Sequence, residues 1–181
     1  MTRVLLPGEP LVEGPTSLRP WRDSDVDALV ACCQDPEISR WTRVPHPYRE
    51  TDARVYLMQR DAAIHAGESA PFAVVATAGG RLLGSITLMR IAWDHDRAEV
   101  GYWLAAEARG QGHATRAVGL ICAWGFTTLR LERIELIAAV GNEPSQRVAG
   151  RCGFHREAHL RSFLRHGHGY DDAFAYGLLA A

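Results

Sequence analysis

The chain has 181 residues, with 20 Lys and Arg against 21 Asp and Glu, and 47% of its residues are hydrophobic. These values are ordinary for one globular domain, and a domain of this length needs neither disulfides nor a structural metal for stability. The net charge of −1 argues against a general polyanion binder, so we expect no nucleic-acid partner. There is no apolar run of membrane-spanning length and no signal-like N-terminus, so we expect a cytoplasmic protein without a membrane partner.

The cysteines and histidines do not form a metal-binding pattern. The four cysteines, at positions 32, 33, 122 and 152, include no C-x-x-C pair, which favours reduced and mostly buried thiols. His166 and His168 flank Gly167 in an expected turn, without an acidic or thiol partner at ligand spacing. We therefore expect no metal site.

The first third of the chain is predicted to be mainly helical. Residues 17–21 form a short mixed strand, and Asp23-Ser24-Asp25 can cap a helix that follows. A second short helix is expected from Asp35-Pro36 to Trp41. A third helix should begin at Thr51-Asp52 and end at Gly67, and its apolar face should be formed by Val55, Met58 and Ile64.

From Phe72 onward the pattern changes to strands. Two apolar runs, 72–76 and 82–89, flank Gly79-Gly80 and predict a hairpin. The strand 98–104 should present two faces, with Val100, Tyr102 and Leu104 on one and Glu99, Gly101 and Trp103 on the other.

The remaining elements alternate. A helix from Ala114 has small and apolar residues at steps of three and four, a strand is expected over 133–140, and a second helix should run from Asn142 to about Cys152-Gly153. The last part of the chain reads as a hairpin of 154–164 and 172–179, in which one face holds Phe174, Tyr176 and Leu178.

The segment Arg109-Gly110-Gln111-Gly112-His113-Ala114 lies between the predicted strand and helix. Two glycines let the backbone turn sharply, and successive N–H groups at a helix start can bind a phosphate. A Walker loop is excluded because no Gly-Lys-Ser/Thr follows, and the dinucleotide fingerprint fails because Thr115 occupies the third glycine position.

This segment resembles the pyrophosphate-binding signature of the GNAT N-acetyltransferase superfamily, met by Arg109, Gly112 and Ala114. Four further stretches, 18–21, 99–104, 142–145 and 150–154, resemble its RimJ/RimL-type branch, which acetylates ribosomal-protein N-termini and other amines. The resemblance covers about residues 16–180. It implies an α+β fold with a mostly antiparallel central sheet, splayed parallel strands and flanking helices, in one domain (1–181) with an N-terminal extension (1–15).

The resemblance implies acetyl-CoA as co-substrate. The backbone amides of four residues would cradle the pyrophosphate: Gln111, Gly112, His113 and Ala114. Trp103 and Leu104 would hydrogen-bond the pantetheine arm through their main chains, and a strand N–H would polarise the thioester carbonyl. Asn142 either binds the pantetheine amides or only caps its helix. Arg109, Arg116 and Arg151 are either phosphate ligands or surface charges.

Acyl transfer to an amine needs a base and a group that stabilises the leaving thiolate. Glu99 is the candidate base, and its alternative role is a structural partner for an arginine or a backbone amide. Glu135 is a weaker candidate, because strand alternation could aim it outward. Ser145 occupies the position where RimL-like enzymes offer a hydroxyl to the sulfur, or it only helps to cap the helix. The tyrosine that other branches use as acid is not found near this helix, so the acid stays open.

The acceptor is not identified from the sequence. The candidate cleft residues Trp41, His46, Tyr48 and Trp93 are either walls of an acceptor cleft or packing residues. A ribosomal protein, another peptide N-terminus, a polyamine and an antibiotic all stay open, because variable loops select the acceptor.

We expect direct acetyl transfer to a primary amine in a ternary complex, without a cysteine acyl-enzyme. The alternatives are a non-catalytic acyl-CoA-binding sensor or interaction protein, and a transferase for a longer acyl-CoA such as succinyl-CoA. The second alternative calls for a basic group near the acyl end, which the sequence alone does not place. A homodimer through edge strands near the C-terminus is a further expectation.

Overall fold

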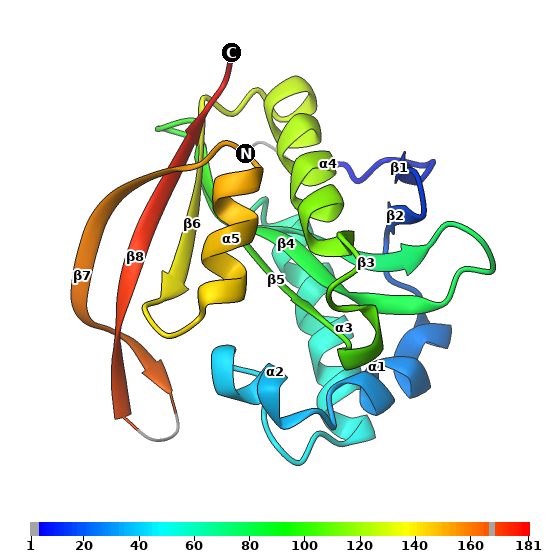
Figure 1. Cartoon of the computed structure of the whole chain (residues 1–181). Helices are drawn as coiled ribbons and strands as arrows, with labels where there is room; N and C mark the ends of the chain where they lie inside the picture. The colour runs from blue at the N-terminus through cyan, green and yellow to red at the C-terminus, as the bar shows by residue number, and fades with distance from the viewer. Residues whose placement is uncertain (1–3, 167–168) are drawn as a thin grey trace.

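A computed structural model describes residues 4–166 and 169–181. Over these residues the chain forms one eight-stranded sheet in the order β1-β2-β3-β4-β5-β6-β8-β7, with helices on both faces (Figure 1). The strands are β1 (Leu11–Glu13), β2 (Thr16–Arg19), β3 (Ala70–Ala76), β4 (Leu82–Ala92), β5 (Arg97–Leu104), β6 (Arg133–Ala139), β7 (His155–His166) and β8 (Gly169–Leu179). The α-helices are α1 (Val26–Cys32), α2 (Pro36–Trp41), α3 (Glu50–His65), α4 (His113–Thr128) and α5 (Glu143–Arg151).

The predicted elements and the α+β class are confirmed. The start of α2 shows why the sequence was informative, since Asp35 accepts a hydrogen bond from the Glu37 amide and Pro36 occupies the first turn. The stretch before residue 16, interpreted as an extension, adds the edge strand β1 to the sheet and places Val4 in the core. None of the helices in the described part of the chain is long and apolar enough to cross a membrane.

The predicted apolar face of α3 is wrong. Val55 and Met58 are 45% and 66% exposed, whereas the helix buries Ala53 and Leu57. Of the three predicted residues, Ile64 packs against the larger core. Apolar residues occur all round this helix, so their spacing did not select one face. Packing in the smaller core decides which face is buried, and it buries Ala53 and Leu57, which lie four residues apart.

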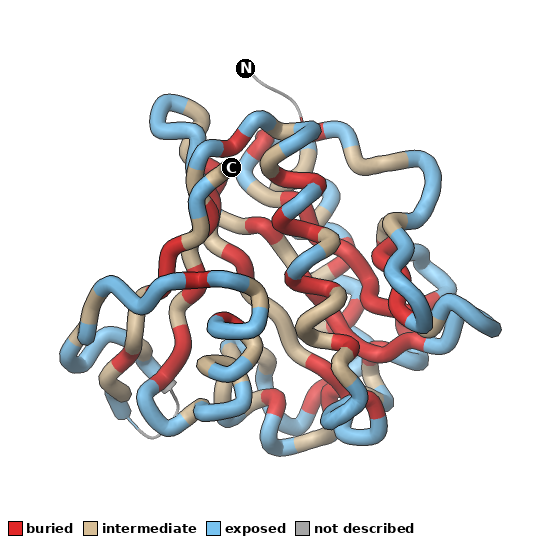
Figure 2. The backbone as a smooth tube through the Cα atoms, turned by 45° about the horizontal axis from the view of Figure 1, so that its top comes forward, coloured by how far each residue is buried: buried red, intermediate tan, exposed pale blue. Residues whose placement is uncertain are grey.

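Two cores cover the two faces of the sheet. Helices α4 and α5 enclose the larger one, where Phe72 and Trp124 pack edge to face with ring centroids 5.3 Å apart. Helices α1 and α3 cover the opposite face with a smaller cluster that includes Trp21 and Leu57. Buried segments follow the central strands and the inner side of α4 (Figure 2).

The feature that positions the site is the separation of β5 from β6. The two strands pair in parallel only from Arg97↔Arg133 to Glu99↔Glu135, although β5 continues to Leu104 and β6 to Ala139. Beyond that point β5 stays paired with β4, while β6 stays paired with β8. The sheet therefore opens between its fifth and sixth strands, as the splayed-strand prediction required.

The hairpin of β7 and β8 closes the sheet at one edge. Its register shifts between Leu160 and Leu164, where Ser162 has a positive φ of +48°. The predicted shared face of Phe174, Tyr176 and Leu178 is confirmed, because all three pack against the main core. The turn residues Gly167 and His168 lie outside the described residues.

Candidate active site

The loop before α4 has the backbone conformation that an anion site needs. Gly110 and Gly112 have φ values of +74° and +80°, which side chains other than glycine rarely adopt. Gly112 caps α4, and the Arg116 amide donates to its carbonyl oxygen at 3.2 Å. The amides just before Arg116 have no acceptor in a preceding helical turn, so they remain donors for a ligand at this positive helix end.

Arg116 adds a positive charge at the same place. Its Nη1 donates to the carbonyl oxygen of Gln111 at 2.9 Å. A Cβ placed on Gly112 would lie 3.1 Å from this Nη1. The guanidinium therefore lies against the loop, beside the free amides.

The other loop side chains hold the loop itself. Arg109 donates from Nε and Nη2 to the Leu104 carbonyl oxygen at 3.0 and 2.8 Å, and its Nη2 lies 2.6 Å from the Asp35 carboxylate. The Gln111 amide nitrogen donates to the Glu107 carbonyl oxygen at 2.6 Å. His113 is buried, and its Nδ1 lies 2.8 Å from Thr16 Oγ1. Burial and the nearby Arg116 lower the pKa of His113, which favours the neutral ring.

The opening between β5 and β6 offers main-chain groups to a ligand. The Ala105 amide donates to the Leu83 carbonyl oxygen at 2.8 Å. Because the direction of the peptide groups alternates along a strand, the N–H and C=O of Trp103, two residues earlier, also face β4. Tyr102 and Leu104 direct theirs toward the opening. The Leu104 carbonyl already accepts hydrogen bonds from Arg109. The Leu104 N–H and the N–H and C=O of Tyr102 therefore remain available to a ligand. The Trp103 side chain packs against the smaller core.

Tyr102 is the residue that sequence reasoning missed. The expectation that no tyrosine lies near α5 is wrong, because the Tyr102 hydroxyl is 3.1 Å from Ser145 Oγ. Burial raises the pKa of Tyr102 to about 12, although the hydrogen bond with Ser145 opposes the shift. Strand alternation placed Tyr102 on one face of its strand with Val100 and Leu104, but it did not show that this face meets α5.

Asn142 caps α5, as one of its two predicted roles required. Its Oδ1 accepts a hydrogen bond from the Ser145 amide at 3.2 Å. The cap holds the first turn of α5, with Ser145 in it, against the end of β5.

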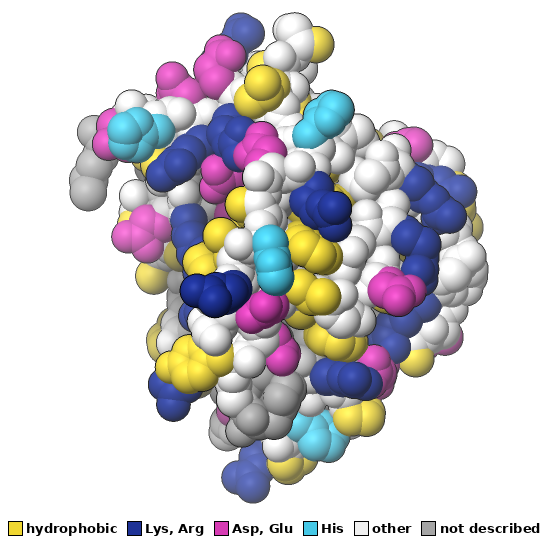
Figure 3. Space-filling view, turned by 60° about the vertical axis from the view of Figure 1, so that its left-hand side comes forward, with side chains coloured by type: hydrophobic (Ala, Val, Ile, Leu, Met, Phe, Trp, Pro, Cys, Tyr) yellow, Lys and Arg dark blue, Asp and Glu magenta, His cyan; other side chains and the backbone are white. Residues whose placement is uncertain are grey.

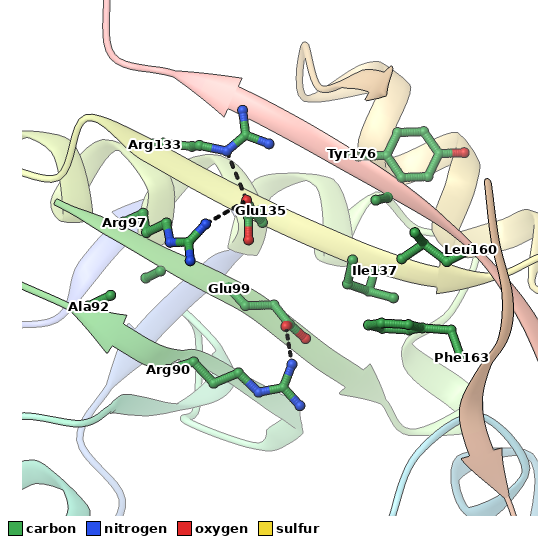
Figure 4. A pocket seen from close by; sticks show the side chains of 12 residues that line it. Arg90, Ala92, Arg97, Glu99, Arg133, Glu135, Ile137, Leu160, Phe163 and Tyr176 are labelled. Carbon is green, nitrogen blue, oxygen red and sulfur yellow. Dashed lines mark hydrogen bonds and ion pairs between the residues drawn. The ribbon is translucent and has the colours of Figure 1, made fainter. Parts of the chain in front are cut away.

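Glu99 faces the opposite side of β5, into a cavity of about 380 Å³ (Figure 4). Its Oε2 accepts a hydrogen bond from Arg90 Nη1 at 2.6 Å, so the predicted alternative of an arginine partner holds in this structure. Burial raises the pKa of Glu99, with the Arg90 charge opposing. The cavity is lined by Arg90, Ala92, Arg97, Ala98, Glu99, Arg133, Glu135, Ile137, Leu160, Phe163, Ala175 and Tyr176.

Glu135 lies beside Glu99 rather than pointing outward. The two residues are register partners at the last paired position of β5 and β6, and both line the cavity. Glu135 Oε1 accepts from Arg133 Nε at 2.9 Å and lies 3.8 Å from Arg97. The outward orientation expected from alternation is therefore wrong, because parallel partners in register share a face.

Of the four aromatic or histidine candidates for the acceptor cleft, Trp41 lines a cavity. It borders a second cavity of about 240 Å³ between α2 and β8, where its ring packs over Gly141. Tyr48 is buried in the smaller core, Trp93 donates to the Gly67 carbonyl oxygen at 2.8 Å, and His46 is exposed.

The model of the acetyltransferase (GNAT) domain family matches residues 16–155 of this chain, which is most of its length. The chain belongs to the GNAT acetyltransferase family. The resemblance and the fold expected from it are thus confirmed.

Relatives of this GNAT chain are named N-acetyltransferases. The uncharacterized N-acetyltransferase YoaA of Bacillus subtilis is 28% identical over 156 residues, or 85% of this chain and 88% of that protein. RimJ of Mycobacterium smegmatis, solved with a CoA disulfide, superposes with a TM-score of 0.84 at 24% identity, covering 92% and 83% of the two chains. A Vibrio cholerae spermidine N-acetyltransferase, solved with CoA and spermine, superposes with a TM-score of 0.79 at 25% identity. The match covers 91% of this chain and 95% of that one.

The cysteines of this GNAT domain are weak nucleophiles. All four are free thiols, and burial raises the pKa of Cys152, the one nearest the start of α5 in sequence, to about 11. Its Sγ donates to the Thr115 carbonyl oxygen at 3.4 Å. A thiol that stays protonated at neutral pH is poorly suited to accept an acyl group.

Proposed function

We propose that this protein is an acetyl-CoA-dependent N-acetyltransferase in which a primary amine attacks the acetyl thioester directly. One observation carries the proposal. At the point where β5 and β6 separate, Glu99 lies on one side of the sheet and the Tyr102–Ser145 pair on the other. A base on the acceptor side and hydroxyls on the thiol side are what amine acylation needs.

The loop residues fit coenzyme A. The free amides of 111–114 and the Arg116 guanidinium offer donors and positive charge to a pyrophosphate. The Tyr102 carbonyl and the Leu104 N–H offer strand-like hydrogen bonds to the pantetheine amides, because the Leu104 carbonyl is already used by Arg109. The predicted main-chain hydrogen bond from Trp103 to the pantetheine arm does not fit this geometry, because the Trp103 peptide groups face β4. Arg109 and Asn142 stay predicted cofactor ligands, although Arg109 also binds the Leu104 carbonyl and Asn142 also caps α5.

Bound acetyl-CoA supplies an acetyl group as a thioester. The acceptor nitrogen forms the new C–N bond and the C–S bond breaks. As the amide forms, the nitrogen loses a second proton and the sulfur gains one, so coenzyme A leaves as the thiol. In our proposal Glu99 takes the proton that the ammonium must lose, directly or through water. In the same proposal the Tyr102 amide, which faces the opening, donates to the carbonyl oxygen as negative charge develops there.

The leaving sulfur needs a proton or a strong hydrogen bond. Tyr102, with a pKa near 12, is the more acidic of the two paired hydroxyls, because an aliphatic hydroxyl such as that of Ser145 is a weaker acid than a phenol. We propose that Ser145 presents a hydroxyl to the sulfur and that Tyr102 supports it through the hydrogen bond at 3.1 Å. A hydrogen bond to a developing thiolate is stronger than one to a neutral sulfur.

The assay that tests the proposal mixes the purified protein with acetyl-CoA and single primary amines. We expect free thiol to appear only when an acceptor is present, together with a product heavier by one acetyl group in mass spectrometry. CoA binding in calorimetry without transfer to any amine would instead support the sensor alternative. A faster reaction with succinyl-CoA would support the longer acyl donor.

Changing Gly112 to Val should weaken CoA binding. The residue has a φ of +80°, and a β-branched side chain there costs about 1–2 kcal/mol or moves the amides away from the phosphate. We expect the calorimetric Kd for CoA to rise on the order of tenfold or more. Gly153→Val is the matched control, because Gly153 has a φ of +82° beyond the far end of α5. Equal affinity loss in both variants would show that strain, not the loop, is responsible.

A cytoplasmic location and a homodimer remain proposals. The outer edge strand β7 is 12 residues long and has an unpaired edge, which supports pairing between two copies. Light scattering in solution tests the dimer, and a monomer at assay concentration contradicts it.

A further inference from the structure

Two arginines beside Glu99 have most of their hydrogen-bond donors unused. Arg97 lies two residues before Glu99 on β5 and is 49% exposed. Within the described residues its side chain makes no hydrogen bond, and its ion-pair partner is Glu135 at 3.8 Å. Arg90 is 60% exposed and binds Glu99 through Nη1 alone. A guanidinium has five N–H donors, so both groups can still bind a planar anion.

The backbone of Arg90 is strained in the way that directs its side chain into the cavity. Its φ is +53°, in the left-handed region, and it lies where the register between β4 and β5 shifts, between Met89 and Ala92. A bulge of this kind re-aims a side chain, and such strain concentrates at functional sites. In the close view Arg90 bonds the Glu99 carboxylate, whereas the Arg97 guanidinium lies on the other side of the Glu99 side chain and is directed toward Glu135 (Figure 4).

The lining of the cavity carries one excess positive charge. Three arginines and two glutamates line it, Glu157 binds Arg133 from outside the lining, and the charge of Arg43 also acts on Glu99. A polyamine would bring several positive charges to a site where both carboxylates already face arginines, which is unfavourable. A zwitterion with one ammonium and one carboxylate adds no net charge, and its carboxylate suits the excess of arginine.

The wall opposite the arginines is apolar. Ile137 of β6 and Leu160 and Phe163 of β7 face Glu99 across the cavity (Figure 4), and Phe163 is 48% exposed. On the surface that carries the β7–β8 hairpin, charged and hydrophobic side chains are interspersed (Figure 3). An acceptor with an apolar side chain would bury it against this wall.

We infer that the acceptor of this site is an α-amino acid with an apolar side chain, whose carboxylate binds Arg97 and Arg90 and whose amine lies at Glu99. This inference rests on the proposed function and names its substrate class. Residues two apart on a strand lie about 6.6 Å apart, and the long arginine side chain bridges that span to a carboxylate next to the amine. The cavity volume of about 380 Å³ suits a ligand of this size.

Three acceptors that share one amine and one ring test the inference: phenylalanine, phenylalaninamide and phenethylamine. Only the first has a carboxylate, and the amide mimics a peptide N-terminus. We expect kcat/KM for phenylalanine to exceed that of the other two on the order of 100-fold. Calorimetry with the CoA-bound protein should show the same order of affinity, independently of turnover.

Arg97→Gln should reduce the phenylalanine-to-amide ratio of kcat/KM about tenfold or more, mainly through the KM of phenylalanine. Arg97→Lys keeps the charge but lacks the planar fork, so it should restore only part of the ratio. The matched control is Arg54→Gln, because Arg54 is 66% exposed on the outer helix α3, where it pairs with Glu50. Its ratio should equal that of the wild type.

Other outcomes overturn the inference in distinguishable ways. Acetylation of all three acceptors at equal rates, or a preference for spermidine or for the amide, contradicts the amino acid class while the proposed function stands. A preference for succinyl-CoA over acetyl-CoA with phenethylamine assigns the arginines to the donor instead. CoA binding without acetylation of any amine overturns the proposed function, and the inference with it.

Discussion

Replacing Tyr102 with Phe is expected to lower kcat on the order of 100-fold, with little change in the Kd for CoA. The phenol hydroxyl lies 3.1 Å from Ser145 Oγ, on the α5 side of β5, whereas the candidate phosphate loop lies beyond the end of the strand. The substitution removes one oxygen and keeps the ring packed. The loss should therefore fall on the step in which charge develops on sulfur.

The leaving group distinguishes a role of Tyr102 in stabilising the thiolate through Ser145 from a merely structural role. If Tyr102 stabilises the departing thiolate, an acetyl thioester of a more acidic thiol should lose less rate in Tyr102→Phe than acetyl-CoA does. A merely structural tyrosine would slow both donors equally. Burial raises the pKa of Tyr102 to about 12, so its proton is retained and no alkaline decline from this group is expected below about pH 11.

Ser145→Ala provides the partner measurement for Tyr102. Its loss and that of Tyr102→Phe should not add in the double variant, because the two hydroxyls share one hydrogen bond. Tyr170→Phe is the control, since Tyr170 is 63% exposed on β8. Wild-type kcat in Tyr102→Phe would exclude the proposed role.

The sequence predicted the elements of this fold because local rules and tertiary packing agree in them. The apolar stripe of α4, the Asn142 cap of α5 and the glycine hairpin before β4 each depend on neighbours in the chain. Helix α3 shows the opposite case. Its apolar residues allow more than one buried face, and the strands that select Ala53 and Leu57 follow it in the chain.

The candidate site was only partly predictable for a related reason. Alternation along β5 separated Glu99 from Tyr102, and the glycines marked the loop. The contact between Tyr102 and Ser145 joins residues 43 positions apart, and no local pattern reports it. Arg90 lies just beyond the predicted strand 82–89 and reaches the cavity where the register between β4 and β5 shifts, so the sequence did not place it.

Replacing Glu99 with Gln is expected to lower kcat about 1,000-fold near neutral pH, within the range of general-base catalysis. The variant keeps the shape of the side chain and a hydrogen-bond acceptor for Arg90, but it cannot take a proton from the acceptor ammonium. Glu50→Gln is the control, since Glu50 is 60% exposed and pairs with Arg54 on α3. An unchanged kcat in Glu99→Gln would exclude the base role.

The pH profile separates a base from a structural partner of Arg90. The carboxylate is the active form, and burial raises its pKa, so the acidic decline of wild-type kcat should lie above the ordinary value of 4.5. Below that pKa, kcat should fall tenfold per pH unit as Glu99 takes up its proton. Glu99→Gln should lose this decline, while Arg90→Gln should keep it with a further raised midpoint, because the favourable charge of Arg90 is gone. If Glu99 only anchored Arg90, Glu99→Gln and Arg90→Gln would show the same loss of kcat and the same pH profile.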